Sequence, residues 1–426
     1  MSKLEVDKID PQSGTDLELG TSGDTITIPA GVTFDSSAAT NTLPSTVVTT
    51  TGSQTLTNKT INASQLIDDS VTTAKLAYNP NPFRNIIING DMSIAQRGTS
   101  FTGLTGISYN LDRWETTAYT MTGGQYQVDQ STDTPTGFTY SQKISCTTAH
   151  TQDVNNQFYI QQQIEGVNSS QLNYFVASPD TVTLSFWVKA NLTGSYTCAL
   201  KLSDNGSVES NTSTRVYNTT YSISSADTWE KKTVTIVLDS AVGDVQVVNN
   251  RFAVSVLWWL GAGTSRDGAA ANSWINNGNA TTAADNLDLL GNTSNEWYIT
   301  GVQLEAGTSA SDFEFLPYDV NLQRCERYYQ IIDSVIGTAG GTTAVYAAIL
   351  FPTVMRASPS ISASGVMTWR DLAADFTQSS ASATLWSTFQ SARGVGCSFA
   401  NLTGMTTYRP MLLVPTSGNI LFSSEL

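Results

Sequence analysis

Charged residues are scarce in this sequence: Asp, Glu, Lys and Arg make up 13% of its 426 residues, against roughly a quarter in an average soluble domain. The few charges are mostly acidic, with a formal net charge of −15 and a sequence pI near 4.4. No cluster of lysine and arginine offers a local exception. Such a chain repels phosphate backbones, so we expect no nucleic acid partner.

Histidine is limited to His150, which excludes HExxH zinc sites and leaves a single candidate for histidine-based catalysis. The four cysteines are widely spaced and form no CxxC pair, so neither a zinc knuckle nor a disulfide framework is indicated. The glycine-rich stretches at residues 261–268 and 337–343 lack the context of a phosphate-binding loop. We therefore expect no cofactor, and we interpret His150 as an ordinary loop residue.

Long hydrophobic runs are also missing. The longest strongly apolar run, residues 252–263, falls far short of the roughly 20 residues that span a bilayer. The opening residues contain no apolar segment of the kind found in signal peptides. The sequence thus predicts neither a membrane helix nor a secretory signal.

What the sequence contains instead is Thr, Ser, Asn and Gln, which favour strands and turns. In residues 181–190, Val182, Leu184, Phe186 and Val188 alternate with polar residues and fall on one face of a strand. About eight such segments, separated by turns, predict an all-β fold with a jelly-roll β-sandwich over residues 83–319. Similar segments predict a smaller C-terminal β-sandwich within residues 320–426.

The first 82 residues follow another pattern. Residues 1–20 carry a charged arm, and residues 21–82 consist of short polar strands with isolated apolar residues. Such strands lose more chain entropy than they gain from burial in a monomer, whereas three parallel copies could bury them along a shared axis. The pattern predicts a thin trimeric strand-built shaft at 21–82, with a flexible linker as the alternative.

A short charged and aromatic stretch separates the two predicted sandwiches. Leu322, Cys325 and Tyr329 are spaced i, i+3 and i+7, which predicts one face of a short helix, here termed the bracket. Two hypotheses remain open: the bracket locks neighbouring chains of a trimer in register, or it packs within its own chain. The candidate residues are Leu322, Arg324, Cys325, Glu326, Arg327, Tyr328 and Tyr329.

Several stretches between about residues 50 and 330 resemble tail fibre proteins of tailed bacteriophages. They include "TLTNKTIN", "NIIINGDMSIAQRG" and, most specifically, "ITGVQLEAGTSASDFEFLPYDVNLQRCERYYQ". The resemblance implies a virion tail fibre: a homotrimer whose residues 1–20 dock on a tail adaptor or nozzle protein. It also implies a jelly roll similar to carbohydrate-binding modules, and a C-terminal tip that attaches to a host cell-surface glycan or outer-membrane receptor. The first fifty and last hundred residues match no part of this family.

Glycan binding requires aromatic rings that stack on sugars and polar groups that bind hydroxyls. Trp258 and Trp259 are adjacent in a strand, so they point to opposite faces. Trp114, Trp187 and Trp229 are expected in the core, and Phe389 is a further aromatic candidate at the tip. The candidate receptor-binding or glycan-binding residues are Trp258, Trp259, Trp274, Trp369, Trp386 and Tyr408.

Two other function classes compete with adhesion. A polysaccharide-degrading tail spike needs two carboxylates across a glycosidic bond; Asp285 with Asp288, or Asp204 with Glu209, could be nominated, but neither spacing is informative. A non-adhesive structural virion protein, such as a baseplate or capsid decoration protein, needs no site at all. We expect a binding protein without catalytic residues.

A structural calcium ion is often held near the first and last strands of jelly-roll modules of this kind. Asp91 and Glu305 fall at such positions here. Calcium prefers six to eight oxygen ligands, so two carboxylates do not establish a site. We therefore predict no metal.

Overall fold

The computed structural model describes residues 83–151, 153–206, 214–240, 244–276, 282, 287–371, 373–378, 383–414 and 418–426, with only the backbone of 378 and 385–388. The predicted arm at 1–20 and the predicted trimeric shaft at 21–82 lie outside these residues, so both stay predictions.

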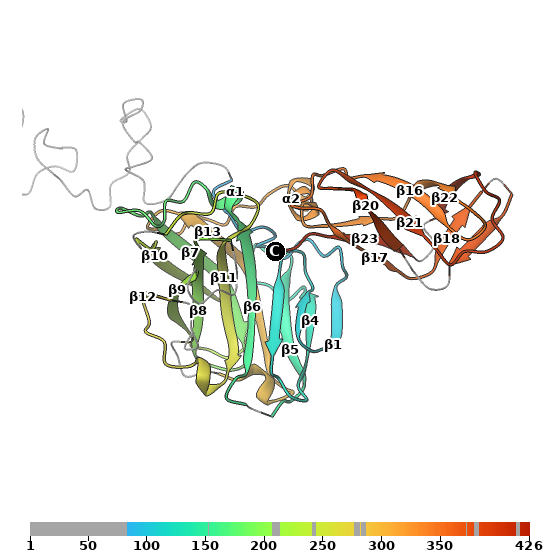
Figure 1. Cartoon of the computed structure of the whole chain (residues 1–426). Helices are drawn as coiled ribbons and strands as arrows, with labels where there is room; N and C mark the ends of the chain where they lie inside the picture. The colour runs from blue at the N-terminus through green and yellow to red at the C-terminus, as the bar shows by residue number, and fades with distance from the viewer. Residues whose placement is uncertain are drawn as a thin grey trace, which may run out of the picture. The chain divides into compact units, whose positions relative to one another are not determined.

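Two antiparallel sheets, both visible in Figure 1, form a β-sandwich. In spatial order, the six-stranded sheet consists of β1 (Ser100–Leu104), β4 (Gln125–Ser131), β5 (Ser141–Thr148), β13 (Glu296–Ala306), β7 (Thr181–Ala190) and β10 (Glu230–Val237). The seven-stranded sheet consists of β12 (Ser273–Asn276), β9 (Thr214–Ile223), β8 (Gly194–Ser203), β11 (Phe252–Ala262), β6 (Gln157–Glu165), β3 (Glu115–Tyr119) and β2 (Ile107–Tyr109). Neighbours in space that are distant in sequence, such as β5 and β13, give the crossing connections of a jelly roll.

The sandwich core is built from alternate residues of the two facing sheets. Val182, Leu184, Phe186 and Val188 of β7 are all buried in it, which confirms the predicted alternation. β11 is buried on both faces along its whole length and, apart from Ser255, consists of apolar residues and glycine, which explains why its sequence shows no alternation.

β13 lies at the centre of the six-stranded sheet, where it pairs with β5 on one side and with β7 on the other. The segment at residues 84–90 also lies against it: Ile86 donates its N–H to the Leu304 carbonyl at 3.1 Å, and Val302 donates to Gly90 at 2.9 Å. The beginning and the end of the sandwich are therefore joined by backbone hydrogen bonds.

The smaller C-terminal unit is a second all-β structure with its own core, in which Trp369, Met367 and Phe399 are fully buried. Its three-stranded sheet consists of β14 (Tyr329–Ile332), β23 (Asn419–Ser423) and β17 (Ser360–Ser364). Its seven-stranded sheet consists of β19 (Asp375–Gln378), β18 (Met367–Arg370), β22 (Pro410–Val414), β15 (Ile336–Ala339), β16 (Val345–Leu350), β21 (Gly394–Phe399) and β20 (Ala383–Ser391).

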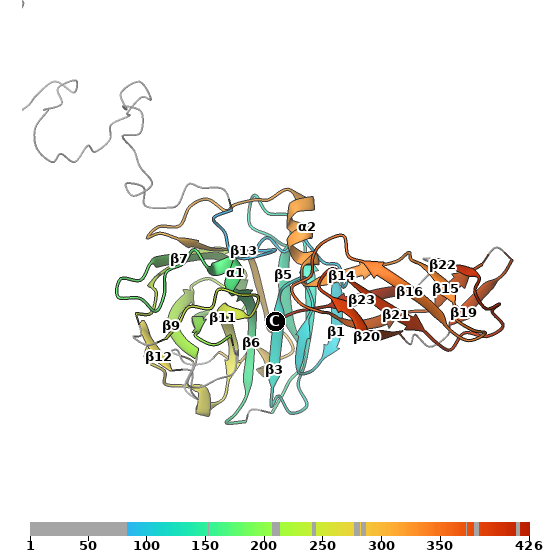
Figure 2. The same cartoon turned by 45° about the horizontal axis from the view of Figure 1, so that its top comes forward.

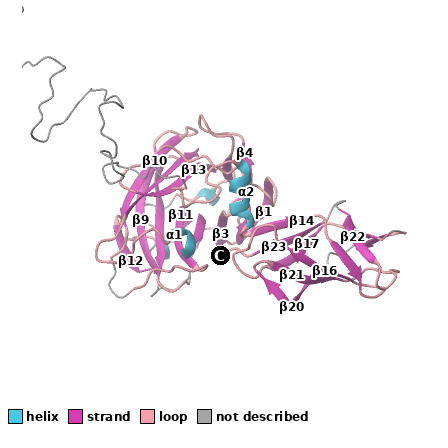
Figure 3. Cartoon of the chain, turned by 90° about the horizontal axis from the view of Figure 1, so that it is seen from above, coloured by secondary structure: helices cyan, strands magenta, loops and turns pink. Residues whose placement is uncertain are grey.

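Helix is rare in the part of the chain that the structure describes. α1 (Gly166–Ser169) and α2 (Tyr318–Glu326) are the α-helices, and η3 (Thr264–Arg266) and η4 (Leu289–Gly291) are single 3₁₀ turns (Figure 3). No described helix has the length and apolar character to cross a bilayer. The predicted all-β, sandwich-type fold class is confirmed.

α2, labelled in Figure 2, contains most of the predicted bracket residues, and its side chains pack against other parts of the same chain. Cys325 is fully buried with Ile88, Ile94 and Tyr328, and burial raises the pKa of its thiol, so the thiol stays neutral. Leu322 packs on the edge of the same cluster.

The charged bracket residues also have partners within the chain. Burial lowers the pKa of the Arg324 guanidinium, and the side chain of Glu326 accepts a hydrogen bond from Thr353 at 2.8 Å. Arg327 pairs with the fully buried carboxylate of Glu165 on β6. These contacts are those of the intrachain alternative, and a role between copies stays a prediction.

Candidate functional site

Three of the nominated tryptophans are buried. Trp258 is fully buried in the sandwich core, where its ring meets Phe186 edge-on at 5.3 Å. Trp259 does point to the opposite face, as predicted, but it is buried there against Tyr159 at 4.9 Å. Trp369 lies in the core of the smaller unit. A buried ring cannot stack on a sugar, so the nominations of these three residues are corrected to structural positions.

The other nominated aromatics lie nearer the surface. Trp274 is half-buried, donates its indole N–H to the Val237 carbonyl at 2.8 Å and packs against Tyr217. Tyr408 and Phe389 are exposed on the smaller unit, by 83% and 64% respectively. The side chain of Trp386 lies outside the described residues.

A pocket of about 250 Å³ opens on the outer face of the six-stranded sheet. Its three phenylalanines form a mutually contacting cluster, with ring centroids 5.2 Å apart for Phe138 and Phe313, 5.1 Å for Phe138 and Phe315, and 4.8 Å for Phe313 and Phe315. Phe315 is 54% exposed, so the cluster presents aromatic surface to solvent. The lining residues are Thr136, Gly137, Phe138, Ser185, Trp187, Lys231, Gly301, Asp312, Phe313 and Phe315.

Strand register places Trp187 in this pocket. Its neighbours Phe186 and Val188 point into the core, so Trp187 points outward. It lies directly across from Lys231 of β10 on one side and Thr300 of β13 on the other. Trp187 was expected in the core, and the half-buried position on the outer face corrects that expectation.

Gly301 makes room for the aromatic rings. The pairing of β13 with β7 shifts register between Thr300 and Gln303, and Gly301 adopts φ +60° within this irregularity. A Cβ atom there would lie 2.6 Å from Phe138 Cζ and 3.0 Å from Trp187 Cδ1. Glycine at this position therefore serves both the backbone conformation and the close approach of the two rings.

Two side chains of opposite charge line the same pocket. Asp312 and Lys231 are both exposed, and neither forms an ion pair or a side-chain hydrogen bond with another described residue. A free carboxylate supplies hydrogen-bond acceptors and a free ammonium supplies donors. Together with the rings, they offer the stacking surface and polar groups by which hydroxylated rings are recognised.

A second aromatic and charged cluster lies on the same outer face. The Lys189 ammonium lies 4.2 Å from the centre of the Tyr298 ring and pairs with Asp133. Trp229 donates its indole N–H to the same carboxylate at 3.0 Å. Trp229, expected in the core, is instead a half-buried surface residue anchored by Asp133.

Asp133 predicts a pH dependence for this cluster. Burial raises the pKa of its carboxyl, but hydrogen bonds from Lys189 and Trp229, together with the charges of Lys189 and Lys143, lower it, and the net pKa is lowered. The stabilisation is therefore present above the ordinary carboxyl pKa of about 3.9 and is lost as pH falls through the lowered folded pKa. We expect the indole N–H resonance of Trp229 to shift below about pH 4. The same shift in Asp133→Asn would assign the titration to another group.

The smaller unit carries a different kind of surface, a groove of about 450 Å³ beside β16 and β21. Exposed Leu350 and Phe389 line it, together with Gly394 and Gly396. Residues 348–350 pair with 394–396 in the β-ladder, so the backbone there is already occupied, and the lining is mostly apolar. The polar residues that line the groove are Gln390, Ser391 and Arg393, and Phe389 supplies its one aromatic ring. The groove therefore offers a sugar less aromatic surface for stacking than the aromatic pocket does.

The nominated acidic residues have other roles or lie outside the described residues. His150 is buried, and its Nε2 bonds the carboxylate of Asp288 at 2.8 Å while its Nδ1 bonds Asn156 at 2.8 Å. His150 lies in the loop that follows β5, as predicted, and its side chain is buried there. Asp285 and Glu209 lie outside the described residues, and Asp204 is half-buried.

The carboxylate of Glu305 is occupied by protein partners. It accepts bonds from the Ser311 backbone, the Ser311 hydroxyl and Gln303 at 2.7–2.9 Å. Asp91 bonds Ser93 and Asn321. Among the described residues, no three His, Cys, Asp or Glu side chains lie together as a metal site requires.

Two features of the sequence indicate residues of this pocket that were not among the predicted site residues. The alternation that buries Phe186 and Val188 also requires Trp187 to face outward. Phe313 and Phe315, two residues apart in a segment that follows the last sandwich strand, are aromatic residues outside any predicted strand. Neither feature reveals Phe138, which comes from a distant loop.

No protein family model matches this chain, and no curated protein matches its sequence. Several solved structures are similar in part. The enzymatically active domain of tailspike protein 4 from bacteriophage CBA120 is 10% identical with a TM-score of 0.26, and the match covers 53% of this chain and 22% of that chain. A protein described as sugar-binding from Bacteroides thetaiotaomicron is 12% identical with a TM-score of 0.30, covering 52% and 99%.

A family 11 carbohydrate-binding module from Clostridium thermocellum, solved with a mixed-linked tetrasaccharide, is 11% identical with a TM-score of 0.26, covering 50% of this chain and 99% of that one. At TM-scores of 0.30 and below, these likenesses are too weak to transfer a ligand or an activity to this chain.

Proposed function

We propose that this protein binds glycans through the aromatic pocket on the outer face of the six-stranded sheet. The observation that carries the proposal is one pocket that combines exposed aromatic rings with a carboxylate and an ammonium that have no partner among the described residues. Sugars present apolar ring faces and hydroxyl groups, and each finds a matching group here.

The biological setting we propose is a tail fibre of a bacteriophage virion, assembled as a homotrimer that attaches the particle to the host surface. The sequence resemblance at residues 50–330 supports this setting. Trimerisation would serve adhesion through avidity: a millimolar contact is worth only about 4 kcal/mol, while linked sites raise apparent affinity by roughly a hundredfold or more. We propose binding without catalysis; a polysaccharide-degrading spike and a non-adhesive virion protein are the alternatives.

Substitution of pocket aromatics tests the proposal. We expect Trp187→Ala and Phe315→Ala each to weaken binding to an immobilised glycan array by about tenfold or more, since about 1.4 kcal/mol of lost stacking corresponds to that factor. Tyr119→Ala, which removes an exposed ring from the other sheet, is the matched control and should bind as the parent chain does.

Each alternative predicts a different result. If glycan binding survives both pocket substitutions, the binding site lies outside the pocket. Release of reducing ends from a bound polysaccharide would favour the degrading spike. A folded chain that binds neither the array nor host cells would favour the non-adhesive virion protein.

A further inference from the structure

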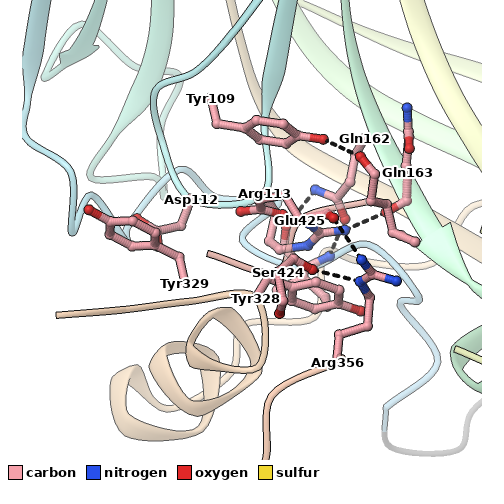
Figure 4. A network of polar contacts seen from close by, with 12 residues as sticks. Tyr109, Asp112, Arg113, Gln162, Gln163, Tyr328, Tyr329, Arg356, Ser424 and Glu425 are labelled. Atoms are coloured by element: carbon pink, nitrogen blue, oxygen red, sulfur yellow. Dashed lines mark hydrogen bonds and ion pairs between the residues drawn. The ribbon is translucent and has the colours of Figure 1, made fainter. Parts of the chain in front are cut away.

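Residues 424–426, which follow β23, lie against the sandwich (Figure 4). The carboxylate of Glu425 is held by two guanidinium groups of the sandwich: Arg97 donates to Oε1 at 2.9 Å, and Arg113 donates to Oε2. Both carboxylate oxygens therefore bond to residues more than 300 positions away in the sequence.

The two arginines are themselves fixed in place. Arg113 is 1% exposed, and it donates a second bond to the backbone carbonyl of Gln163. Its guanidinium lies 3.5 Å from the centre of the Tyr328 ring, and that of Arg97 lies 3.6 Å from Tyr329. This packing of arginine on aromatic rings is a cation–π arrangement, which orients the donors before any carboxylate arrives.

Electrostatics explain why a carboxylate belongs at this position. Burial lowers the pKa of Arg113, but the Glu425 carboxylate, followed by Tyr328, Tyr109 and Cys325, raises it, and the net pKa is raised, so the guanidinium stays charged. A buried cation whose partner is removed is strongly destabilised. The site that Arg97 and Arg113 form around the Glu425 carboxylate, here termed the slot, therefore favours an acidic residue over a neutral one.

The backbone of the segment is also recognised. Tyr109 donates its hydroxyl to the Leu426 carbonyl at 2.9 Å, while Arg356 donates to the carbonyls of Ser424 at 2.6 Å and Glu425 at 2.8 Å. In addition, the Ser424 N–H donates to the Tyr328 carbonyl at 2.8 Å. Side chains thus bond the carbonyls of three successive residues, as in a peptide-binding site.

We propose that this slot is a binding site for an acidic peptide segment, and that residues 424–426 occupy it as an intramolecular ligand. The occupied slot fastens the smaller β unit to the sandwich. Because recognition uses one carboxylate and backbone carbonyls, the same segment supplied on a separate molecule should also bind when the slot is empty.

A second, independent attachment across the same junction makes the proposal testable. Glu165 of β6 is fully buried and accepts bonds from Arg327 at 2.8 Å and from the Tyr328 hydroxyl at 2.5 Å. These bonds do not involve residues 424–426. A chain that lacks the segment should therefore keep the smaller unit attached through the bracket.

The experiment uses the chain shortened to end at residue 423 and a fluorescent, C-terminally amidated peptide, Ser-Glu-Leu, which corresponds to residues 424–426. The amide is suitable because the contacts involve the glutamate side chain and backbone carbonyls. We expect saturable binding to the shortened chain by fluorescence anisotropy, and no binding to the full chain. A peptide with Gln in place of Glu should bind at least tenfold more weakly.

A second variant protects the test from a folding failure. Glu425→Gln in the full chain should increase hydrogen exchange at residues 419–426 relative to the parent chain, while exchange in the sandwich strands is unchanged. Absence of peptide binding to a shortened chain with parental circular dichroism would overturn the proposal. Unchanged exchange in Glu425→Gln would overturn it as well.

Discussion

Trp258→Ala should destabilise the protein by about 3–5 kcal/mol, which is the usual cost of truncating a fully buried aromatic residue. The side chain is completely buried, and its ring centroid lies 5.3 Å from that of Phe186 and 5.9 Å from that of Trp114. Removal of the indole leaves a cavity between the two sheets that neighbouring side chains fill only in part. Urea unfolding of the purified variant measures the loss.

The matched control is Trp187→Ala, which removes the same side chain from a half-buried position on the outer face. We expect it to change the free energy of unfolding much less than Trp258→Ala does, while it abolishes most glycan binding. The reverse pattern, with stability retained in Trp258→Ala and binding lost, would restore Trp258 as a ligand-contacting residue.

Gly301→Val is the second substitution with a large expected effect. A β-branched residue at φ +60° pays roughly 1–2 kcal/mol of backbone strain, and the new Cβ would lie 2.6 Å from Phe138 Cζ. The rings of Phe138 and Trp187 must then move. We therefore expect both lower stability and loss of glycan binding, measured by thermal unfolding and by the array.

Gly123→Val is the control that distinguishes the effect of backbone strain from the effect of the steric clash at Gly301. Gly123 has a comparable φ of +75°, but a Cβ there would meet nothing within 4 Å. The Gly123→Val variant should therefore lose stability through backbone strain alone, and it should bind glycan as the parent chain does. If Gly301→Val bound glycan as Gly123→Val does, the pocket would not depend on the position of these two rings.

The fold class was predictable because strand alternation is a local property of the sequence. The run of Val182, Leu184, Phe186 and Val188 is sufficient to place one face of a strand in a core. The order of strands in each sheet is not local: that β13 lies between β5 and β7 depends on pairings across more than a hundred residues.

The site was less predictable than the fold for the same reason. Trp258 and Trp259 were nominated because they are aromatic, but whether they are buried depends on the residues that cover the two faces of their strand. Phe138 and Phe313 meet only after the sheet has formed, and they lie 175 positions apart by their residue numbers. The bracket helix was found from its spacing, whereas its partner Glu165 was not.

The central position of β13 has a consequence for synthesis of the chain. On the ribosome, β5 and β7 are complete long before residue 306 appears, an interval on the order of 10 s at translation rates of roughly 5–20 residues per second. During that time both strands lack the neighbour that separates them in the finished sheet. Unpaired strand edges are sites of aggregation. The yield of soluble protein should therefore depend on how long the nascent chain is protected from its copies.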